Sequence, residues 1–236
     1  MSPIKRDLTG TVHPIVSEGH PALREMSQEI PLPEITSPKI QTLIADMKKS
    51  LASQDDGIGL AAPQIGVPLR IFIVSKKIFS SHNPNTVPMD SMDVANEKSS
   101  TASVAEKNAN TSTALSIAKT SAKIDDLVFI NPVLTKMSKE KKWMEGEGCL
   151  SVRWVYGKVQ RSTKVTIRAY DEFGRAFERG AGGLLAHIFQ HEVDHLNGIL
   201  FIDTAKDLEE VDPKDVKKEK TKAAKAASAT SAKAKK

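Results

Sequence analysis

The stretch Gln190–Gly198 reads Gln-His-Glu-Val-Asp-His-Leu-Asn-Gly and contains the pattern His-Glu-x-x-His. On an α-helix, residues four apart share a face, so His191 and His195 project side by side. Two neutral imidazoles at this spacing bind one metal ion, and a glutamate between them acts as general base toward a water on that ion. The stretch therefore predicts a helix with two metal ligands, and Glu192 as the base.

The flanking residues support this helix. Leu184 and Ile188 continue the three-to-four spacing of the histidines, which places the ligands on an inward, largely apolar face. Gly182 and Gly183 stand at the expected start, and Gly198 is a suitable C-terminal stop. The alternative is a buried helix whose histidines are only hydrogen-bonded, because a pattern with three fixed letters also occurs by chance.

A third ligand has to come from another part of the chain. Catalytic sites of this kind normally use three protein ligands and keep one position open. One protease class supplies a third histidine six residues after the second, in the pattern His-Glu-x-x-His-x-x-Gly-x-x-His. Here Gly198 fits that pattern, but Phe201 occupies its last position. The sequence therefore disfavours this protease class.

Composition limits the class of protein. The chain has 236 residues, of which 39% are hydrophobic, so we expect one domain with extensions that do not pack. No apolar run is long enough to span a bilayer, and the polar N-terminus resembles neither a secretory signal nor an Arg/Ser-rich presequence. The single cysteine excludes an internal disulfide framework and fits a reducing compartment. These features predict a cytoplasmic protein without membrane segments.

The formal net charge of +5 is unevenly distributed. Residues 212–236 hold nine Lys against three acidic residues, a charge of +6, whereas the rest of the chain holds 25 Lys and Arg against 26 Asp and Glu, a charge of −1. A near-neutral body gives no reason to expect DNA binding. We predict that residues 212–236 form a disordered basic tail, which either contacts ribosomal RNA beside emerging chains or only aids solubility.

The first half of the chain predicts one helix and one insertion. Residues 14–36 form a proline-rich lead-in, and apolar residues at helical spacing predict a helix over about 38–53. Residues 80–124 are rich in Ser, Thr, Asn, Ala and Lys and lack hydrophobic periodicity. We therefore expect residues 80–124 to be a disordered insertion.

Strands are expected on both sides of the insertion. Residues 70–75 and 127–131 read as buried strands. Residues 163–170 alternate apolar and polar side chains, a turn follows, and residues 175–179 return. The pattern predicts a β-hairpin that leads into the histidine helix.

Two further segments hold residue types suited to chemistry. Gly57–Gly66 reads Gly-Ile-Gly-Leu-Ala-Ala-Pro-Gln-Ile-Gly. Taken alone it predicts a tight loop leading to a strand, with Gln64 as a lone amide among small apolar residues. Glu147–Ser151 reads Glu-Gly-Cys-Leu-Ser and contains the only cysteine, Cys149. Taken alone, such a cysteine is most often a small buried hydrophobe.

Together, residues 57–64, 147–151 and 190–198 resemble the three motifs of peptide deformylases, in order and with the functional letters intact. The resemblance covers most of residues 14–210 and implies a catalytic domain over 1–211 that contains the insertion. It implies an α+β fold in which antiparallel β-sheets pack around a central metal-binding helix. It also implies an enzyme that removes the formyl group from the N-terminal formyl-methionine of newly synthesised proteins.

The resemblance assigns the metal chemistry to four residues. Cys149, His191 and His195 would bind one divalent metal ion. Fe(II) is typical of the family, and Zn, Ni or Co can occupy the site, in loose agreement with a thiolate and two imidazoles as ligands. Water on the metal would attack the formyl carbon, with Glu192 acting as general base and then as general acid.

The resemblance assigns the handling of the substrate to two other segments. The side-chain amide of Gln64 and the backbone N–H of Leu150 would donate hydrogen bonds to the developing oxyanion. Ile58, Gly59 and Leu60 would bind the main chain of the substrate, because the small residues of this loop leave room for it.

Some residues depart from the family pattern or add to it. Residues 153–156 read Arg-Trp-Val-Tyr where many members carry a proline, which leaves the rim of the substrate pocket undefined. His187 lies one turn before His191, and we expect it to line the site or support a ligand rather than bind the metal. Glu147 either orders the site through an arginine such as Arg161 or is solvated.

Two other functions account for part of the pattern. A metal-dependent endopeptidase shares His-Glu-x-x-His but does not predict the cysteine and glutamine motifs. A non-catalytic protein with a structural zinc needs four protein ligands, and the sequence offers three. The presence of Glu192 and Gln64 also favours an enzyme over a structural site.

Overall fold

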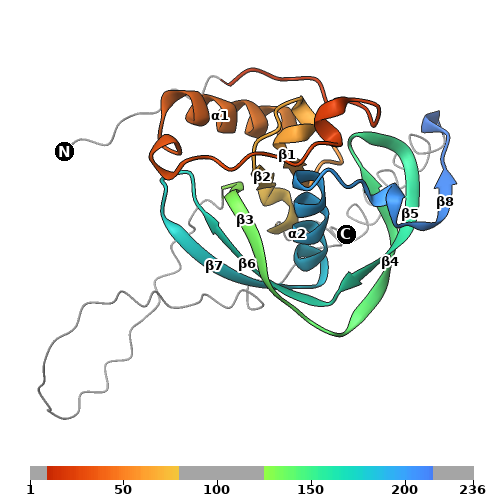
Figure 1. Cartoon of the computed structure of the whole chain (residues 1–236). Helices are drawn as coiled ribbons and strands as arrows, with labels where there is room; N and C mark the ends of the chain where they lie inside the picture. The colour runs from red at the N-terminus through yellow and green to blue at the C-terminus, as the bar shows by residue number, and fades with distance from the viewer. Residues whose placement is uncertain (1–9, 80–124, 215–236) are drawn as a thin grey trace, which may run out of the picture.

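The computed structural model describes residues 10–79 and 125–214. In these residues the helices α1 (Pro38–Ala52) and α2 (Gly183–Leu196) accompany two antiparallel sheets (Figure 1). The strand order is β1-β2-β3-β6-β7 in the first sheet and β4-β5-β8 in the second. The strands are β1 Gly59–Ala61, β2 Ile71–Val74, β3 Leu127–Met137, β4 Lys141–Cys149, β5 Val152–Ser162, β6 Lys164–Tyr170, β7 Ala176–Gly182 and β8 Lys206–Glu210. The expected α+β class is confirmed.

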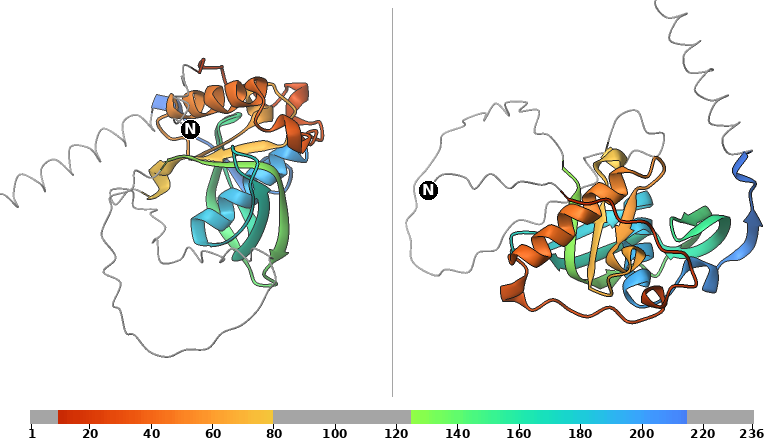
Figure 2. Two further views of the ribbon diagram at one scale, coloured as in Figure 1. Left: turned by 90° about the vertical axis from the view of Figure 1, so that its left-hand side faces the viewer. Right: turned by 90° about the horizontal axis from the view of Figure 1, so that it is seen from above.

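The five-stranded sheet lies between the two helices (Figure 2). Successive side chains of a strand point to opposite faces. Phe72 and Val74 of β2 therefore pack with Phe189 of α2 in one core, while Ile73 packs with Met47 of α1 in a second core. All five side chains are fully buried. This packing fixes α2, and with it the two histidines, against the sheet.

The three-stranded sheet has a smaller core of its own. Val152 and Val159 of β5 pack there with Leu23, Leu200 and Phe201. Leu23 belongs to a short 3₁₀ helix, Pro21–Leu23, and Phe201 begins another, Phe201–Asp203. Further 3₁₀ helices span Leu32–Glu34, Ala62–Ile65 and Lys76–Phe79. Because β4 ends at Cys149, this sheet brings the cysteine motif toward α2.

Both helices begin and end as their sequences predict. Ser37 caps α1, with its Oγ accepting a hydrogen bond from the N–H of Ile40, and Pro38 occupies the first turn, where its missing N–H costs nothing. Gly182 is the N-cap of α2. Gly198 follows α2 with a φ of +73°, a left-handed conformation that favours glycine and terminates the helix.

Several strands were not predicted or differ from the prediction, among them β1, β3 and β8. The segment over 57–66 was predicted to be a loop, but it contains the short strand β1. Glycine and alanine have low strand propensity, so the sequence did not indicate this strand. Strand β3 continues six residues beyond the expected end, with a register shift between Ile130 and Val133 around Pro132. Strand β8 was not predicted, because all five of its residues are exposed and only its backbone pairing with β5 defines it.

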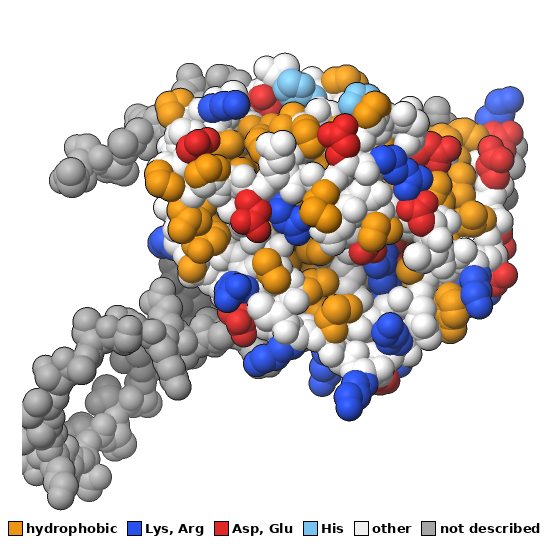
Figure 3. Space-filling model, in the orientation of Figure 1, with side chains coloured by type: hydrophobic (Ala, Val, Ile, Leu, Met, Phe, Trp, Pro, Cys, Tyr) orange, Lys and Arg blue, Asp and Glu red, His pale blue; other side chains and the backbone are white. Residues whose placement is uncertain are grey.

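The predicted insertion over 80–124 and residues 215–236 of the predicted tail lie outside the described residues. Of the two described helices and the 3₁₀ turns, none is long and apolar enough to cross a membrane. On the face drawn in Figure 3, acidic and basic side chains are both spread over the described surface, and basic side chains are more frequent along its lower edge. This pattern is consistent with the near-neutral charge of the body of the chain.

Candidate active site

The structure brings the three predicted metal ligands together. Cys149 stands at the end of β4, and His191 and His195 lie one turn apart on α2. One ligand atom from each lies within 4.8 Å of the others. The Sγ of Cys149 is 3.2 Å from Nε2 of His195. Two imidazoles and a thiol converging on one point form a donor set that suits a divalent transition metal ion.

The orientation of His191 also fits a metal ligand. Its Nδ1 is 2.7 Å from Oε1 of Glu147, and the carboxylate accepts the hydrogen bond. A proton held on Nδ1 leaves the lone pair of Nε2 free for a metal ion. The Nδ1 of His195 is buried and has no hydrogen-bond partner among the described residues. The two histidines are therefore more than hydrogen-bonded core residues. Nε2 of His195 lies beside the thiol, and the hydrogen bond with Glu147 uses only Nδ1 of His191.

Electrostatics favour the thiolate form of the cysteine. Burial alone raises the pKa of the Cys149 thiol, but the positive charge of His195 and the hydrogen bonds with both histidines lower it well below its ordinary value. Burial likewise opposes a charge on His191, yet its contacts with Cys149 and Glu147 raise its pKa well above the ordinary value. The surroundings of Cys149 thus favour the thiolate, which is the form that binds metals.

Glu192 lies between the ligands but does not belong to the ligand cluster. Its side chain is buried on α2, and its Oε2 has no hydrogen-bond partner among the described residues. Burial raises its pKa to about 7, although the two neighbouring histidines act in the opposite direction. A carboxyl group with a pKa near neutrality can both accept and return a proton, which is the requirement for a general base and acid.

Gln64 points its amide toward the ligands. The side-chain Oε1 accepts a hydrogen bond from the N–H of Ala61 (2.8 Å), which fixes the amide, and Nε2 lies 3.4 Å from Sγ of Cys149. The same Nε2 is 3.4 Å from Oγ of Ser151. Gln64 is buried, so the held N–H group can serve as a donor to a group bound beside the cysteine. Leu150 follows Cys149 in the sequence, and both residues line one pocket.

A pocket of about 450 Å³ opens onto the ligands. Its wall includes Ile58 and Gly59, two of the three residues predicted to bind substrate. Leu60 does not line this pocket, because its side chain is fully buried in the core shared with α1. The remaining wall combines large side chains of β4, β5 and α2 with the motif residues, and includes Met144, Trp154, Val155, Tyr156, Leu184 and Ile188. The rim residues that depart from the family pattern therefore shape this pocket.

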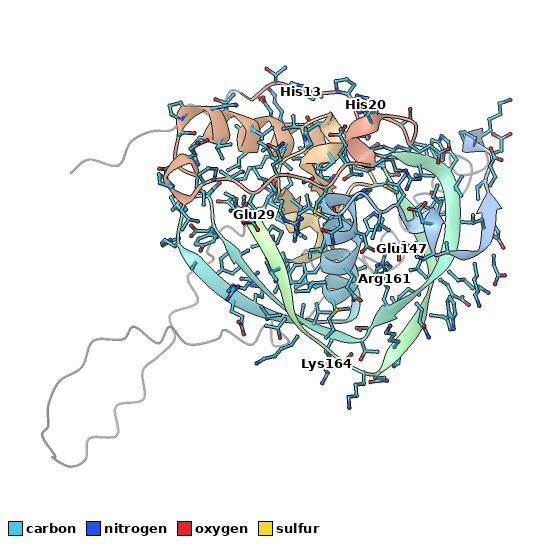
Figure 4. All side chains as sticks on the ribbon, viewed as in Figure 1. His13, His20, Glu29, Glu147, Arg161 and Lys164 are labelled. Carbon is cyan, nitrogen blue, oxygen red and sulfur yellow. The ribbon has the colours of Figure 1, made fainter. Side chains whose placement is uncertain are left out.

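Glu147 and Arg161 lie beside α2 (Figure 4) and belong to a network of charged side chains that contacts His191. Glu147 is 4% exposed and binds Arg161 through Nη2 (2.6 Å) and Nε (3.2 Å). Arg161 also contacts Asp194, and His187 contacts the second oxygen of Glu147. Two alternatives were considered for Glu147. The structure agrees with the first, because the carboxylate is paired with Arg161 and is buried away from solvent. Asp194 was missed, although its position between the ligands in the histidine motif was an available signal.

Comparison with known proteins agrees with this geometry. The family model described as polypeptide deformylase matches residues 12–211. A peptide deformylase of Psychrobacter arcticus is 34% identical over 202 residues, which is 86% of this chain and 84% of that protein. Peptide deformylase 1A, chloroplastic/mitochondrial, of Arabidopsis thaliana is 36% identical over 190 residues, 80% of this chain. The chain spans 60% of the length of that plant relative.

Solved structures lead to the same family. A peptide deformylase from Legionella pneumophila matches with a TM-score of 0.60 and 30% identity, and covers 84% of this chain and 88% of that one. A Met-Ala-Ser-bound class I type b peptide deformylase from Acinetobacter baumannii matches with a TM-score of 0.60 and 28% identity, over 83% of this chain and 99% of that one. This chain belongs to the polypeptide deformylase family.

Proposed function

We propose that this protein is a metal-dependent hydrolase that removes the formyl group from the N-terminal formyl-methionine of newly synthesised proteins. The observation that carries the proposal is the convergence of Cys149, His191 and His195 beside a pocket whose wall includes Glu192 and Gln64. A divalent ion held by the three ligands supplies the Lewis acidity that makes water nucleophilic near neutral pH. A structural zinc site normally has four protein ligands, and this cluster provides three.

Glu192 carries the proton through the reaction. Its carboxylate takes a proton from the attacking water as the new C–O bond forms at the formyl carbon. It then gives that proton to the amine nitrogen as the C–N bond breaks, so the products are formate and a free N-terminal amine. A pKa raised to about 7 by burial suits both steps, because the group is poised between its two protonation states at neutral pH.

Gln64 and Leu150 stabilise the negative charge that develops on the formyl oxygen. The bond from the Ala61 N–H to Oε1 holds the Gln64 amide with its N–H groups toward Cys149. The backbone N–H of Leu150 is the second donor that we assign, as it directly follows the cysteine. Donors that are fixed before the reaction lower the barrier because they need no reorganisation when the charge appears.

The edge strand β1 offers a place for the main chain of the substrate. It is the terminal strand of its sheet and pairs only with β2 within that sheet. The N–H of Ala61 points away from β2, toward Gln64, and strand alternation gives Gly59 the same direction. An extended peptide can therefore add to this edge beside the ligands. A product-like Met-Ala-Ser peptide in the Acinetobacter baumannii relative supports a substrate that begins with Met.

The metal that we propose for the native enzyme is Fe(II), with Zn, Ni or Co as ions that the same ligands accept. A thiolate with two imidazoles suits several of these ions, so the preference comes from the family. The compartment that we propose is the cytoplasm. The only cysteine is a free thiol at the metal site, so the protein needs a reducing environment to stay active.

Substrate choice tests the proposed function directly. The protein is purified without oxygen, its metal content is measured, and turnover is compared for formyl-Met, acetyl-Met and unblocked Met peptides. We expect one metal ion per chain and release of formate from the formyl peptide alone. Cleavage of an internal peptide bond, with no preference for the formyl group, would instead identify an endopeptidase.

The basic tail is proposed to hold the enzyme near ribosomal RNA. Its nine Lys give residues 212–236 a charge of +6, and lysine–phosphate contacts are sequence-indifferent and weaken strongly with salt. Removal of residues 212–236 should leave turnover of a small formyl-Met peptide unchanged but reduce co-sedimentation with ribosomes at low salt. Equal binding by the full-length and truncated proteins would leave the tail with a solubilising role only.

A further inference from the structure

Glu147 holds four hydrogen-bonding groups with one buried carboxylate. Its Oε1 accepts from Nδ1 of His191 (2.7 Å) and from Nη2 of Arg161 (2.6 Å). Its Oε2 accepts from Nε2 of His187 (2.5 Å) and from Nε of Arg161 (3.2 Å). Both oxygens are therefore occupied, and the plane of the carboxylate is set from two sides. Only one of the four bonds leads to a proposed metal ligand.

His187 provides the closer of the two contacts to Oε2 of Glu147. Arg161 also reaches Oε2, but only through the longer Nε contact, and its remaining nitrogen, Nη1, is engaged by Asp194. His187 lies one helical turn before His191 on α2, and its side chain is 13% exposed on the wall of the pocket. The two imidazoles thus contact opposite oxygens of the same carboxylate. A change at one imidazole can therefore affect the other through this carboxylate.

We propose that His187 is a positioning residue for His191 and acts through Glu147. The inference rests on the proposed function insofar as His191 is a metal ligand there. The bond from His187 to Oε2 prevents rotation of the carboxylate, and the fixed Oε1 holds both the ring plane of His191 and the proton on its Nδ1. The lone pair on Nε2 of His191 then stays directed at the metal position. Partners of this kind typically change metal affinity or activity 10- to 100-fold when they are removed.

Three variants separate positioning from packing. His187→Leu removes the donor to Glu147 at a similar volume. His187→Gln keeps an N–H donor at nearly the position of Nε2. Ile188→Val is the matched control, because Ile188 lies next to His187 on the same wall of the pocket and has no bond to Glu147 in the described structure. All three are compared as full-length proteins, after thermal unfolding of the metal-free forms shows that each is folded.

Cobalt(II) is the probe, because its visible absorption reports the ligand geometry as well as binding. The metal-free proteins are titrated with Co²⁺ in competition with a chromogenic chelator. We expect about 10-fold weaker binding or more, with an altered spectrum, for His187→Leu. We expect the wild-type affinity and spectrum for Ile188→Val, and recovery of most of the affinity for His187→Gln.

Two results would overturn the inference in distinguishable ways. An unchanged Co²⁺ affinity and spectrum in His187→Leu would remove the positioning role and leave the proposed function intact, since wild-type binding through Cys149, His191 and His195 would persist. A wild-type protein that binds no Co²⁺ would overturn the ligand assignment itself, and the positioning role with it. Equal losses in His187→Leu and Ile188→Val would identify general damage to the pocket wall and would also contradict the inference.

Discussion

A β-carbon added to Gly59 would lie 2.2 Å from Oε1 of Glu192. Strand β1 therefore approaches the proposed general base as closely as the absence of a side chain allows. In a Gly59→Ala variant the end of the glutamate is the part that must move, since the clash is with the carboxylate and not with backbone. We expect the variant to fold and to retain its metal ion, but to lose on the order of 10²-fold in turnover, as for a catalytic group displaced by about 1 Å.

Gly180→Ala is the matched control for this change. No atom lies within 4 Å of a β-carbon at Gly180, and its backbone is not in the left-handed region. Turnover of a formyl-Met peptide and metal content are measured for both variants. Full activity of Gly59→Ala would show that Glu192 does not need its present position, and equal losses in the two variants would point to a general effect of the added methyl group.

Glu192→Gln should separate proton transfer from metal binding. The amide has nearly the same size as the carboxylate but cannot accept and return a proton at neutral pH. Because Glu192 is not one of the clustered ligand atoms, the variant should hold one metal ion per chain. Turnover should fall at least about 10²-fold, the lower range for a general base. The measurement is kcat for a formyl-Met peptide with metal content determined on the same sample, and a near-normal kcat would exclude the role.

Gln64→Ala should lower turnover about 10²- to 10³-fold, as for removal of one oxyanion donor, and should keep the metal ion. The change also leaves the Ala61 N–H without its acceptor. We therefore expect a loss of unfolding free energy of about 1–3 kcal/mol if that N–H is left unsatisfied. Kinetics at a temperature well below the unfolding midpoint distinguish the two effects. A loss of stability without a loss of turnover would restrict Gln64 to a structural role.

The sequence predicted what depends on side-chain pattern or on motifs. The helical spacing of His191 and His195 and the β-hairpin of β6 and β7 follow from periodicity, and the structure has them. The convergence of Cys149 on α2 could not be derived from spacing, because β4 and α2 are far apart in the chain; the family resemblance supplied it. Strand β8 has no apolar alternation, and its position depends on backbone pairing with β5 that no local pattern encodes.

The buried charges around His191 mark the limit of prediction from sequence. A pattern of residue types cannot say whether Glu147 is solvated, because its burial is decided by how β4, β5 and α2 come together. Once buried, the carboxylate requires a partner, and Arg161 of β5 and the histidines of α2 provide it. Leu60 illustrates the converse case. The preceding residues Ile58 and Gly59 line the pocket, but the side chain of Leu60 points into the core.

Acid should weaken the contact between the lead-in segment and the end of the domain. Oδ2 of Asp203 accepts hydrogen bonds from Arg24 (2.6 Å) and from the N–H of Leu200 (2.9 Å). Burial alone raises the pKa of Asp203, but these bonds lower it below its ordinary value. A lowered pKa means that the stabilisation is present above the unfolded value of about 3.9 and is lost as pH falls through the folded value.

Comparison of wild type with Asp203→Asn by denaturant unfolding tests this contact. The side chains of Arg24 and Asp203 are 44% and 35% exposed, so the difference at pH 7 should be no more than about 1 kcal/mol. The difference should shrink toward zero as the pH is lowered below about 4, because the wild-type carboxylate becomes protonated and neutral like the amide. A difference that stays constant as the pH is lowered through and well below about 4 would show that the charge on Asp203 contributes nothing.

Removal of the thiol should abolish metal binding. Cys149 is the only cysteine of the chain and the only ligand in the cluster that can become anionic, and its surroundings lower the pKa of its thiol, which favours the thiolate. Without it, two imidazoles remain, which is fewer than the three protein ligands of an ordinary catalytic site. Cys149→Ala should therefore lose the ion during purification or bind it far more weakly.

In the wild type the same thiol provides a second measurement, because a thiol reagent should react with one group per chain only after a chelator has removed the metal. Stoichiometric metal held by Cys149→Ala at unchanged affinity, or a wild-type thiol equally reactive with and without the chelator, would remove Cys149 from the set of ligands.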